Sequence, residues 1–381
     1  MNLKTIPMAI VSLAICVLIV VNLCVPIMSP NSDDSDWMYD DYRVIENVES
    51  VDGNLEIVTV GGTDYIHAKG VGSGTITYSN GDVESITVDK AILDVFFLYG
   101  QSNASYRNGD ITQVTDKPPI GTTYYFGYED AYGPPKSLNS TGFDVSLCDM
   151  YTLYDDTGTL RVGGILPSFS YNYYEITGHK LYLIDGAIGG KSITTFDPPS
   201  GQLWTYGDSI LTAGLGELDS DLYDYSCKYY MWIQGESDTN MNINTYKTRF
   251  MEMHTALLSG DMAGVHFQKC FMSKVREKNG VNSSAAQLQL ADEHPNTIEI
   301  VSTDADSFTV ENGLMGSDDL HYSQKGNNII GERFGVAIGE TVNPSYKYDD
   351  AVNNIISIVP IILIVSLVIA SVSIFFVKRR G

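Results

Sequence analysis

Residues 94–103 read DVFFLYGQSN, and the rest of the chain can be organised around this stretch. The apolar run 95–99 ends at Gly100, a pattern that predicts a buried strand followed by a tight turn. Ser102 lies in that turn, between Gln101 and Asn103. In an open α/β sheet, ligands bind beyond the carboxyl ends of the strands, so Ser102 is a candidate nucleophile. The alternative is that its hydroxyl group only caps the next helix.

From residue 91 onward, predicted strands and helices alternate, which favours a mostly parallel sheet covered by helices. The expected strands are 95–99, 181–184, 229–233, 265–272 and 297–302. The expected helices are 168–177, 244–258, 284–294 and 323–338. Residues 104–165 show no clear periodicity apart from a hairpin signal at 156–158. Four of the predicted strands end in polar or glycine-rich turns, which would meet at one edge of the sheet.

Residues 37–90 have a different character, because glycines interrupt short alternating runs. Asn80-Gly81 lies between the runs 75–78 and 85–88, which is the strongest short hairpin signal. These features predict a small β module. Its last part, AKGVGSGTITYSNGDVESITV at 68–88, resembles the final strands of a bacterial immunoglobulin-like repeat. That resemblance implies a spacer or a unit that contacts carbohydrate.

The charge and the cysteines limit the classes of partner and site. The 381-residue chain has a formal net charge of −24, which argues against a nucleic-acid partner because phosphate binding needs clustered Lys and Arg. Cys16 and Cys24 lie in an apolar N-terminal segment, which leaves Cys148, Cys227 and Cys270. No pair has CxxC spacing, so no structural zinc site is expected. One disulfide and three buried thiols both remain open.

Two apolar segments flank the body of the chain. Residues 5–28 are long enough for a membrane anchor or a signal peptide, and both would export the body of the chain. Residues 355–377 are uncharged and precede a basic cluster at 378–380, which predicts a transmembrane helix with a cytoplasmic C-terminus. The body is therefore expected on the extracellular side of the cell membrane. The expected domains are the signal or anchor 1–36, the β module 37–90, the α/β domain 91–345 and the transmembrane helix and tail 354–381.

A histidine in a predicted turn supplies a second chemical group. His321 comes three residues after Asp318, a spacing that lets the carboxylate orient the ring. Transfer of an acyl group needs a nucleophile, a base, an orienting group and donors for the oxyanion. Ser102, His321 and Asp318 can fill the first three roles. The alternative for His321 is a surface histidine near the start of a helix.

Donors for the oxyanion are also available in the turns after the predicted strands. The backbone amides of Ser102 and Gly190 and the side-chain amide of Gln234 can provide them. Glycine suits such a position because the backbone must approach the substrate closely.

Four motifs together resemble a known family. GQSN at 100–103, GGKSI at 189–193, WIQGESD at 232–238 and DDLH at 318–321 occur in the order seen in the SGNH hydrolases. They resemble in particular the group of sialate O-acetylesterases and acetylxylan esterases, over residues 92–340. The resemblance implies a flavodoxin-like three-layer α/β/α fold and hydrolysis of O-acetyl esters on carbohydrates without a metal or organic cofactor.

The resemblance also implies roles for individual residues. Ser102 is then the nucleophile, His321 the base, Asp318 the group that orients it, and Gly190 the oxyanion glycine. The expected contacts to substrate or oxyanion include Asn103 and Gln234, and Glu236 is expected to hold the turns together by hydrogen bonds. Lys191 stands where many relatives have Thr, which leaves the contacts of that loop open.

The same residues also admit other interpretations. The chain could be a non-catalytic cell-surface protein that binds carbohydrate or a partner on an esterase fold, or an esterase of lipids or thioesters. Asp318, Asp319 and the run 303–306 could bind a cation, but a solvated face is favoured and no metal site is expected. The tyrosine-rich stretches 123–128 and 171–174 could stack on sugar rings or pack in the core.

Overall fold

The structure is a computed structural model that describes residues 36–105, 110–127, 138–139, 142–143, 150–155 and 157–346. The chain divides into two compact units, one of which runs from residue 33 to residue 339. Of the other unit, only residues 340–346 are described, and they include the last turn of helix α7 (Gln324–Val342).

A seven-stranded sheet forms the centre of the unit 33–339, in the order β12-β9-β13-β8-β14-β15-β16. Its strands are β8 (Ala91–Gly100), β9 (Thr123–Phe126), β12 (Tyr151–Thr152), β13 (Lys180–Asp185), β14 (Tyr223–Ile233), β15 (Lys269–Met272) and β16 (Ile298–Ile300). All neighbours are parallel except β12, which is antiparallel to β9. From β13 to β16 the order is that of flavodoxin-like sheets. The predicted α/β class is confirmed.

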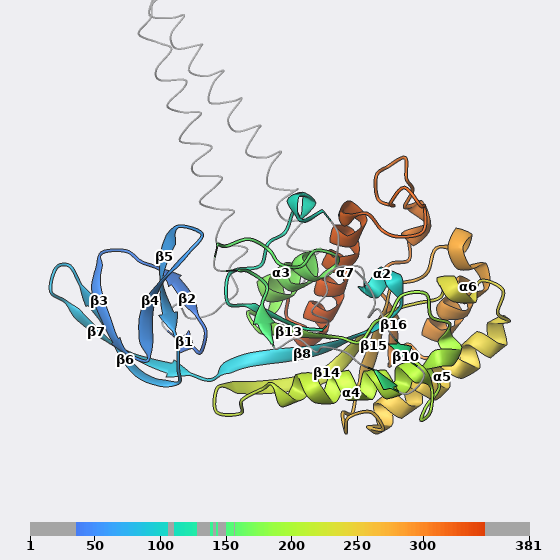
Figure 1. Ribbon diagram of the computed structural model, residues 1–381, viewed down its shortest axis with the longest axis horizontal. Helices are drawn as coiled ribbons and strands as arrows, with labels where there is room; N and C mark the ends of the chain where they lie inside the picture. Colours follow the sequence, from blue (N-terminus) through green and yellow to red (C-terminus); the bar gives the residue numbers. More distant parts are fainter. Residues whose placement is uncertain are drawn as a thin grey trace, which may run out of the picture. The chain divides into compact units, whose positions relative to one another are not determined.

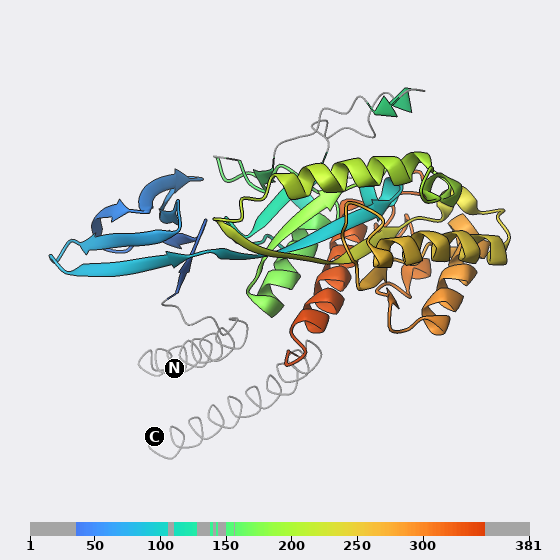
Figure 2. The same ribbon diagram turned by 90° about the horizontal axis from the view of Figure 1, so that it is seen from below.

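Helices cover both faces of this sheet. They are α3 (Leu166–Thr177), α4 (Gln202–Gly216), α5 (Ile243–Ser259), α6 (Glu277–Glu293) and α7. Successive strand residues point to opposite faces, so Phe96 packs against Phe169 of α3 while Tyr99 packs against Trp232 and the backbone of α4. Figure 2 shows the sheet between α4 on one side and α3 and α7 on the other.

Helix α7 packs closely against α3 through three glycines. A β-carbon on Gly331 would come 2.3 Å from the carbonyl oxygen of Ile165, and one on Gly335 would come 2.6 Å from that of Phe169. A β-carbon on Gly339 would come 3.0 Å from the side chain of Ile176. The contacts advance together along both helices, so α7 and α3 run in the same direction. Since α3 leads into the start of β13, α7 also ends at the edge where the parallel strands begin.

Residues 37–89 form two smaller sheets with a core of their own (Figure 1, blue). One sheet contains β1 (Trp37–Met38), β3 (Val48–Gly53), β6 (Gly72–Tyr78) and β7 (Val83–Asp89), and the other contains β2 (Tyr42–Val44), β4 (Leu55–Val60) and β5 (Thr63–Ala68). The hairpin predicted around Asn80-Gly81 is confirmed, because β6 and β7 are antiparallel neighbours. Trp37, Leu55 and Ile76 are among the buried residues between the sheets.

The β module contacts the α/β domain where the parallel strands begin. Lys180, the first residue of β13, donates from Nζ to the carbonyl oxygens of Asp40 at 2.9 Å and Gly121 at 2.6 Å. The rings of Tyr39 and Tyr223 lie 5.2 Å apart, and Tyr223 is the first residue of β14. Strand β8 has ten residues, so the module lies about 30 Å from the opposite end of that strand.

The remaining elements are short. They are α2 (Ser102–Ser105), the two-residue strands β10 (Leu138–Asn139) and β11 (Gly142–Phe143), and the 3-10 helices η2 (Ile111–Gln113), η3 (Ile193–Phe196), η4 (Glu236–Asp238) and η5 (Ala305–Ser307). The hairpin predicted at 156–158 is present as an antiparallel bridge between Tyr154 and Leu160. Among the longer elements of the α/β domain, β9 and α4 were not predicted. Helix α6 begins at Glu277, earlier than the predicted residue 284, and β15 begins at Lys269 rather than 265.

The predicted membrane segments and one cysteine lie outside the described residues. Within the part of the chain that the structure describes, no helix is long and apolar enough to cross a bilayer. The segments 5–28 and 355–377, for which that role is predicted, are not among the described residues. Cys227 and Cys270 are free thiols, and Cys148 is likewise outside the described residues.

Three of the tyrosines from the tyrosine-rich stretches belong to the core. Tyr124, Tyr125 and Tyr173 are buried, which identifies them as packing residues. They therefore do not offer a surface on which a sugar ring could stack.

Candidate active site

Ser102 follows the carboxyl end of β8 at the centre of the sheet. The connections from β8 and β14 lead to opposite sides, so these neighbours form the switch point at which α/β sheets bind ligands. Gly100 has φ 146°, and a β-carbon there would lie 2.1 Å from the carbonyl oxygen of Ile233. The amide of Gln101 donates to that same oxygen at 2.9 Å. The sharp turn that presents Ser102 therefore requires glycine at position 100.

His321 and Asp318 form the pair that their spacing predicts. His321 Nδ1 lies 2.6 Å from Asp318 Oδ2, and the backbone amides of Leu320 and His321 both donate to Asp318 Oδ1 at 3.1 Å. Partial burial disfavours the charged form of Asp318, but the hydrogen bonds from His321 outweigh this and lower the pKa of the carboxyl group below its usual value. The carboxylate is thus held in the charged form that orients a neighbouring imidazole.

Asn103 connects the turn of Ser102 to the loop of His321. Its Nδ2 donates to the carbonyl oxygen of Leu320 at 3.2 Å, and its Oδ1 accepts from the amide of Tyr322 at 3.1 Å. The side chain therefore holds the residue before His321 and the residue after it. Asn103 itself is buried, with 3% of its surface exposed. Asn103 thus links two distant segments, and its predicted contact with the substrate stays a prediction.

Glu236 extends this link to the turn after β14. Its Oε1 accepts a hydrogen bond from Asn103 Nδ2, as the predicted role of holding the turns together requires. Burial raises the pKa of Glu236, and the hydrogen bond from Asn103 offsets this only in part. Three segments that are far apart in the sequence, at 102–103, 236 and 320–322, are therefore joined by one asparagine side chain.

The paired glycines after β13 lie next to Ser102. A β-carbon on Gly189 would come 3.4 Å from Ser102 Cβ, and Gly190 has φ 70° with open space around its α-carbon. No described residue accepts a hydrogen bond from the backbone amides of Ser102, Gly189 or Gly190. Amides that lack a partner at the end of a central strand can serve as donors to an oxyanion. Gly189 thus lies against Ser102, and the assignment of Gly190 as donor stays a prediction.

Gln234 is only 1% exposed, and its side chain is occupied by other protein groups. Its Nε2 donates to the carbonyl oxygen of Lys191 at 3.1 Å and to Asp238 Oδ2, and its Oε1 accepts from Tyr246 at 2.9 Å. This arrangement does not favour Gln234 as a donor to the oxyanion. It instead makes Gln234 a support for the turns around Ser102.

Other supporting residues were not assigned from the sequence. Asp238 accepts hydrogen bonds from Ser192 Oγ at 2.5 Å and from the amide of Ile193 at 2.8 Å, so it fixes the loop that follows the paired glycines. Gln101 Oε1 accepts from Gln234 Nε2 and from the amide of Ser237, each at 3.4 Å. Gln101 and Asp238 both lie inside the GQSN and WIQGESD motifs, and this position is the sequence signal that could have indicated their role.

The cation-binding alternative does not fit the carboxylates of the DDLH loop. Asp319 forms ion pairs with Arg276 and Lys278, while Asp318 is bound to His321. Arg276 is distant in sequence, and no motif indicated it. Among the described residues, no cluster of three or more His, Cys, Asp or Glu side chains could hold a metal ion.

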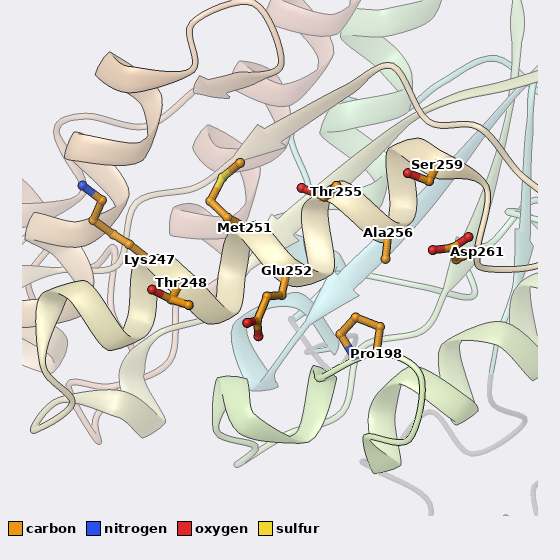
Figure 3. A pocket seen from close by; sticks show the side chains of 9 residues that line it. All are labelled: Pro198, Lys247, Thr248, Met251, Glu252, Thr255, Ala256, Ser259 and Asp261. Atoms are coloured by element: carbon orange, nitrogen blue, oxygen red, sulfur yellow. The ribbon is translucent and has the colours of Figure 1, made fainter.

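A separate groove of about 750 Å³ runs along α5 (Figure 3). In Figure 3, Pro198 lies on the side of α5 to which Glu252 and Ala256 point. None of the predicted site residues lines this groove. The candidate reacting groups therefore lie at the end of β8 and not in this groove.

Comparisons with known proteins give the family. A family model described as "Carbohydrate esterase, sialic acid-specific acetylesterase" matches residues 92–340, which is more than half of the 381-residue chain. No curated protein matches the chain.

Solved structures that resemble this one include three proteins of low sequence identity. NanS is 14% identical with a TM-score of 0.45, over 67% of this chain and 99% of NanS. A carbohydrate acetylesterase from Xanthomonas citri is 13% identical with a TM-score of 0.43, over 84% of this chain and 74% of that protein. A protein from Arabidopsis thaliana is 18% identical with a TM-score of 0.42, over 64% of this chain and 96% of that protein. The family match shows that the chain belongs to the sialic acid-specific acetylesterase family of carbohydrate esterases and is a carbohydrate O-acetylesterase.

Proposed function

We propose that this esterase uses Ser102 as its nucleophile, His321 as its general base and Asp318 as the group that orients the base. The observation that carries the proposal is the position of Asn103. This residue follows Ser102 directly, and its side chain binds the backbone on both sides of His321. The segments that carry the two reacting groups are therefore held together by hydrogen bonds, and Asp318 contacts His321 at 2.6 Å.

The proposed reaction has two steps. Ser102 Oγ attacks the acetyl carbonyl carbon while His321 accepts the hydroxyl proton, and the backbone amides of Ser102 and Gly190 stabilise the oxyanion. When the tetrahedral intermediate collapses, the carbon–oxygen bond to the sugar breaks and His321 protonates the sugar hydroxyl. Water then attacks the acetyl-serine with His321 again as the base, which releases acetate. Asp318 stabilises the imidazolium in both steps.

The test is acetate release by the full-length chain from acetylated sialic acids, acetylated xylan and aryl acetates. Ser102→Ala and His321→Ala are each expected to lower the rate by about 10³-fold or more. Ser209→Ala and His266→Ala are matched controls, because both side chains are exposed and neither residue belongs to the proposed site. Full activity in the two site variants would contradict the proposed roles. Binding of glycans without acetate release would instead favour the non-catalytic interpretation.

We also propose that the enzyme acts outside the cell while tethered to its membrane. The support is in the sequence: residues 355–377 are uncharged and precede Lys378, Arg379 and Arg380. The full-length chain is then expected to stay with the membrane fraction after extraction with alkaline carbonate. Protease added to intact cells is expected to digest the esterase domain. Recovery of the full-length chain in the soluble fraction would contradict tethering.

A further inference from the structure

Asp319 lies between Asp318 and His321, and its backbone adopts a conformation that is rare for residues other than glycine. Its φ is 53°, in the left-handed region. A residue keeps such a conformation when the surrounding structure compensates for its cost. The contacts of Asp319 show what provides this compensation.

Arg276 holds both the backbone and the side chain of Asp319. One nitrogen, Nη1, donates to the carbonyl oxygen of Asp319 at 3.0 Å and to its Oδ1 at 3.0 Å. Asn279 Nδ2 donates to the same carbonyl oxygen at 3.3 Å. Arg276 precedes the first residue of α6, so a helix of the core anchors the loop.

The pair of Arg276 and Asp319 differs in burial from the neighbouring pair of Lys278 and Asp319. The side chain of Arg276 is 6% exposed, whereas that of Lys278 is 67% exposed. Water and salt screen an exposed ion pair, so it contributes little to holding a geometry. A buried guanidinium group keeps its partner firmly, because separation would leave a charge without compensation in a medium of low dielectric constant.

Hydrogen bonds within the loop connect the backbone of Asp319 to Asp318 and His321. The amide of Asp319 donates to the carbonyl oxygen of Gly316 at 2.9 Å. The amide of Gly316 in turn donates to the carbonyl oxygen of His321 at 2.7 Å. Asp318 Oδ1 accepts from the amide of His321 at 3.1 Å. These bonds close a compact turn in which residues 318, 319 and 321 cannot move independently.

We propose that Arg276 is a positioning residue for the esterase: it fixes the left-handed backbone of Asp319 and so holds the Asp318 carboxylate against His321 Nδ1. The inference rests on the proposed roles of Asp318 and His321. The two hydrogen bonds of Arg276 described above both go to Asp319, the residue that lies between Asp318 and His321 in the loop. Its effect is therefore expected to pass through the backbone of the loop.

Two pairs of variants test the proposal. Arg276→Gln and Lys278→Gln each remove one positively charged partner of the Asp319 carboxylate. The first is expected to lower kcat by about 10- to 100-fold at nearly constant KM, and the second by less than about 2-fold. Equal effects of the two would overturn the proposal. Asp319→Ala and Asp319→Gly both remove the carboxylate, but only glycine adopts positive φ without strain. The glycine variant is expected to retain about 10-fold more activity, and equal loss in both would also overturn the proposal.

A measurement without substrate separates this inference from the proposed function. The proton that His321 Nδ1 shares with Asp318 gives a far-downfield NMR resonance when the hydrogen bond is held. This resonance is expected to broaden or shift upfield in Arg276→Gln and to stay in place in Lys278→Gln. An unchanged resonance in folded Arg276→Gln would overturn the positioning role even in an inactive protein. If Arg276→Gln does not fold, the two Asp319 variants provide the same comparison. An inactive wild-type chain would contradict the proposed function alone.

Discussion

The replacement Asn103→Ala tests whether the contact between the Ser102 turn and the His321 loop sets the rate of the enzyme. In the wild type, Asn103 donates to Leu320 and Glu236 and accepts from the amide of Tyr322. Alanine removes all three hydrogen bonds and leaves the rest of the turn unchanged. Because Tyr322 is only 3% exposed, its amide would have no water to replace the lost acceptor.

The magnitude can be worked out from these contacts. Loss of the hydrogen bonds costs about 1 kcal/mol each, and a buried amide without an acceptor adds about 1–3 kcal/mol, while relaxation of the loop recovers part of the sum. We expect the free energy of unfolding to fall by about 3 kcal/mol, which lowers Tm by roughly 5–10 °C in a domain of this size. Displacement of His321 by about 1 Å is expected to lower kcat by about 100-fold.

The assay is acetate release, with Tm measured on the same samples. Asn172→Ala is the matched control, since Asn172 is also a buried asparagine but donates to Ser168 within helix α3 at 2.8 Å. The control is expected to lose about 1 kcal/mol of stability and no activity. If Asn103→Ala folds and keeps kcat within about 3-fold of the wild type, then Asn103 does not position His321. A fall in Tm with an unchanged rate would show that the contact is only structural.

Three further outcomes are expected. Burial alone would lower the pKa of His67, but its hydrogen bonds to Asp40 and Glu56 raise the pKa above the usual 6.5. The contribution of His67 to stability is therefore full below pH 6.5 and is lost as the pH rises through the raised pKa. Tm of the wild type is therefore expected to fall relative to that of His67→Gln as the pH rises above 6.5, and parallel curves would contradict this. Lys180→Met deprives the carbonyl oxygens of Asp40 and Gly121 of their donor and is expected to cost about 2–4 kcal/mol of stability, measured by denaturant titration, while kcat changes less than about 2-fold. Incubation with EDTA is expected to leave acetate release unchanged, and a loss that a divalent cation restores would contradict a metal-free reaction.

The short buried strands were predictable from the sequence because each is an apolar run that ends in a polar or glycine-rich turn. Helix α4 was missed because glycines inside it resemble breaks in a helix. Gly214 instead lies against Ile184 and Phe126, where a β-carbon would come 2.8 Å and 3.0 Å from their side chains. Strand β9 was missed because tyrosines make it look polar, although the hydroxyl group of Tyr125 is satisfied by Asp185 at 2.9 Å.

The candidate site was predictable to the extent that it lies in motifs. Asp318 and His321 are three residues apart, so their contact follows from local spacing. The role of Gln234 could not be read from its motif, because burial and its bonds to Lys191 and Asp238 depend on the packing of two loops. The contact between Arg276 and Asp319 joins segments with no shared pattern, and only the folded chain brings them together.

Gly339 lies near the edge of the seven-stranded sheet where the parallel strands begin, and Trp37 pairs with Val88, just before β8 starts at that same edge. Ser102 lies at the opposite edge. Any attachment through the residues before 37 or after 339 would therefore pull on the edge that carries no reacting groups. The edge that carries Ser102 is separated from that edge by the length of β8, about 30 Å. The parallel packing of α7 and α3 thus brings the chain at residue 339 to the end of the domain that is remote from the reacting groups.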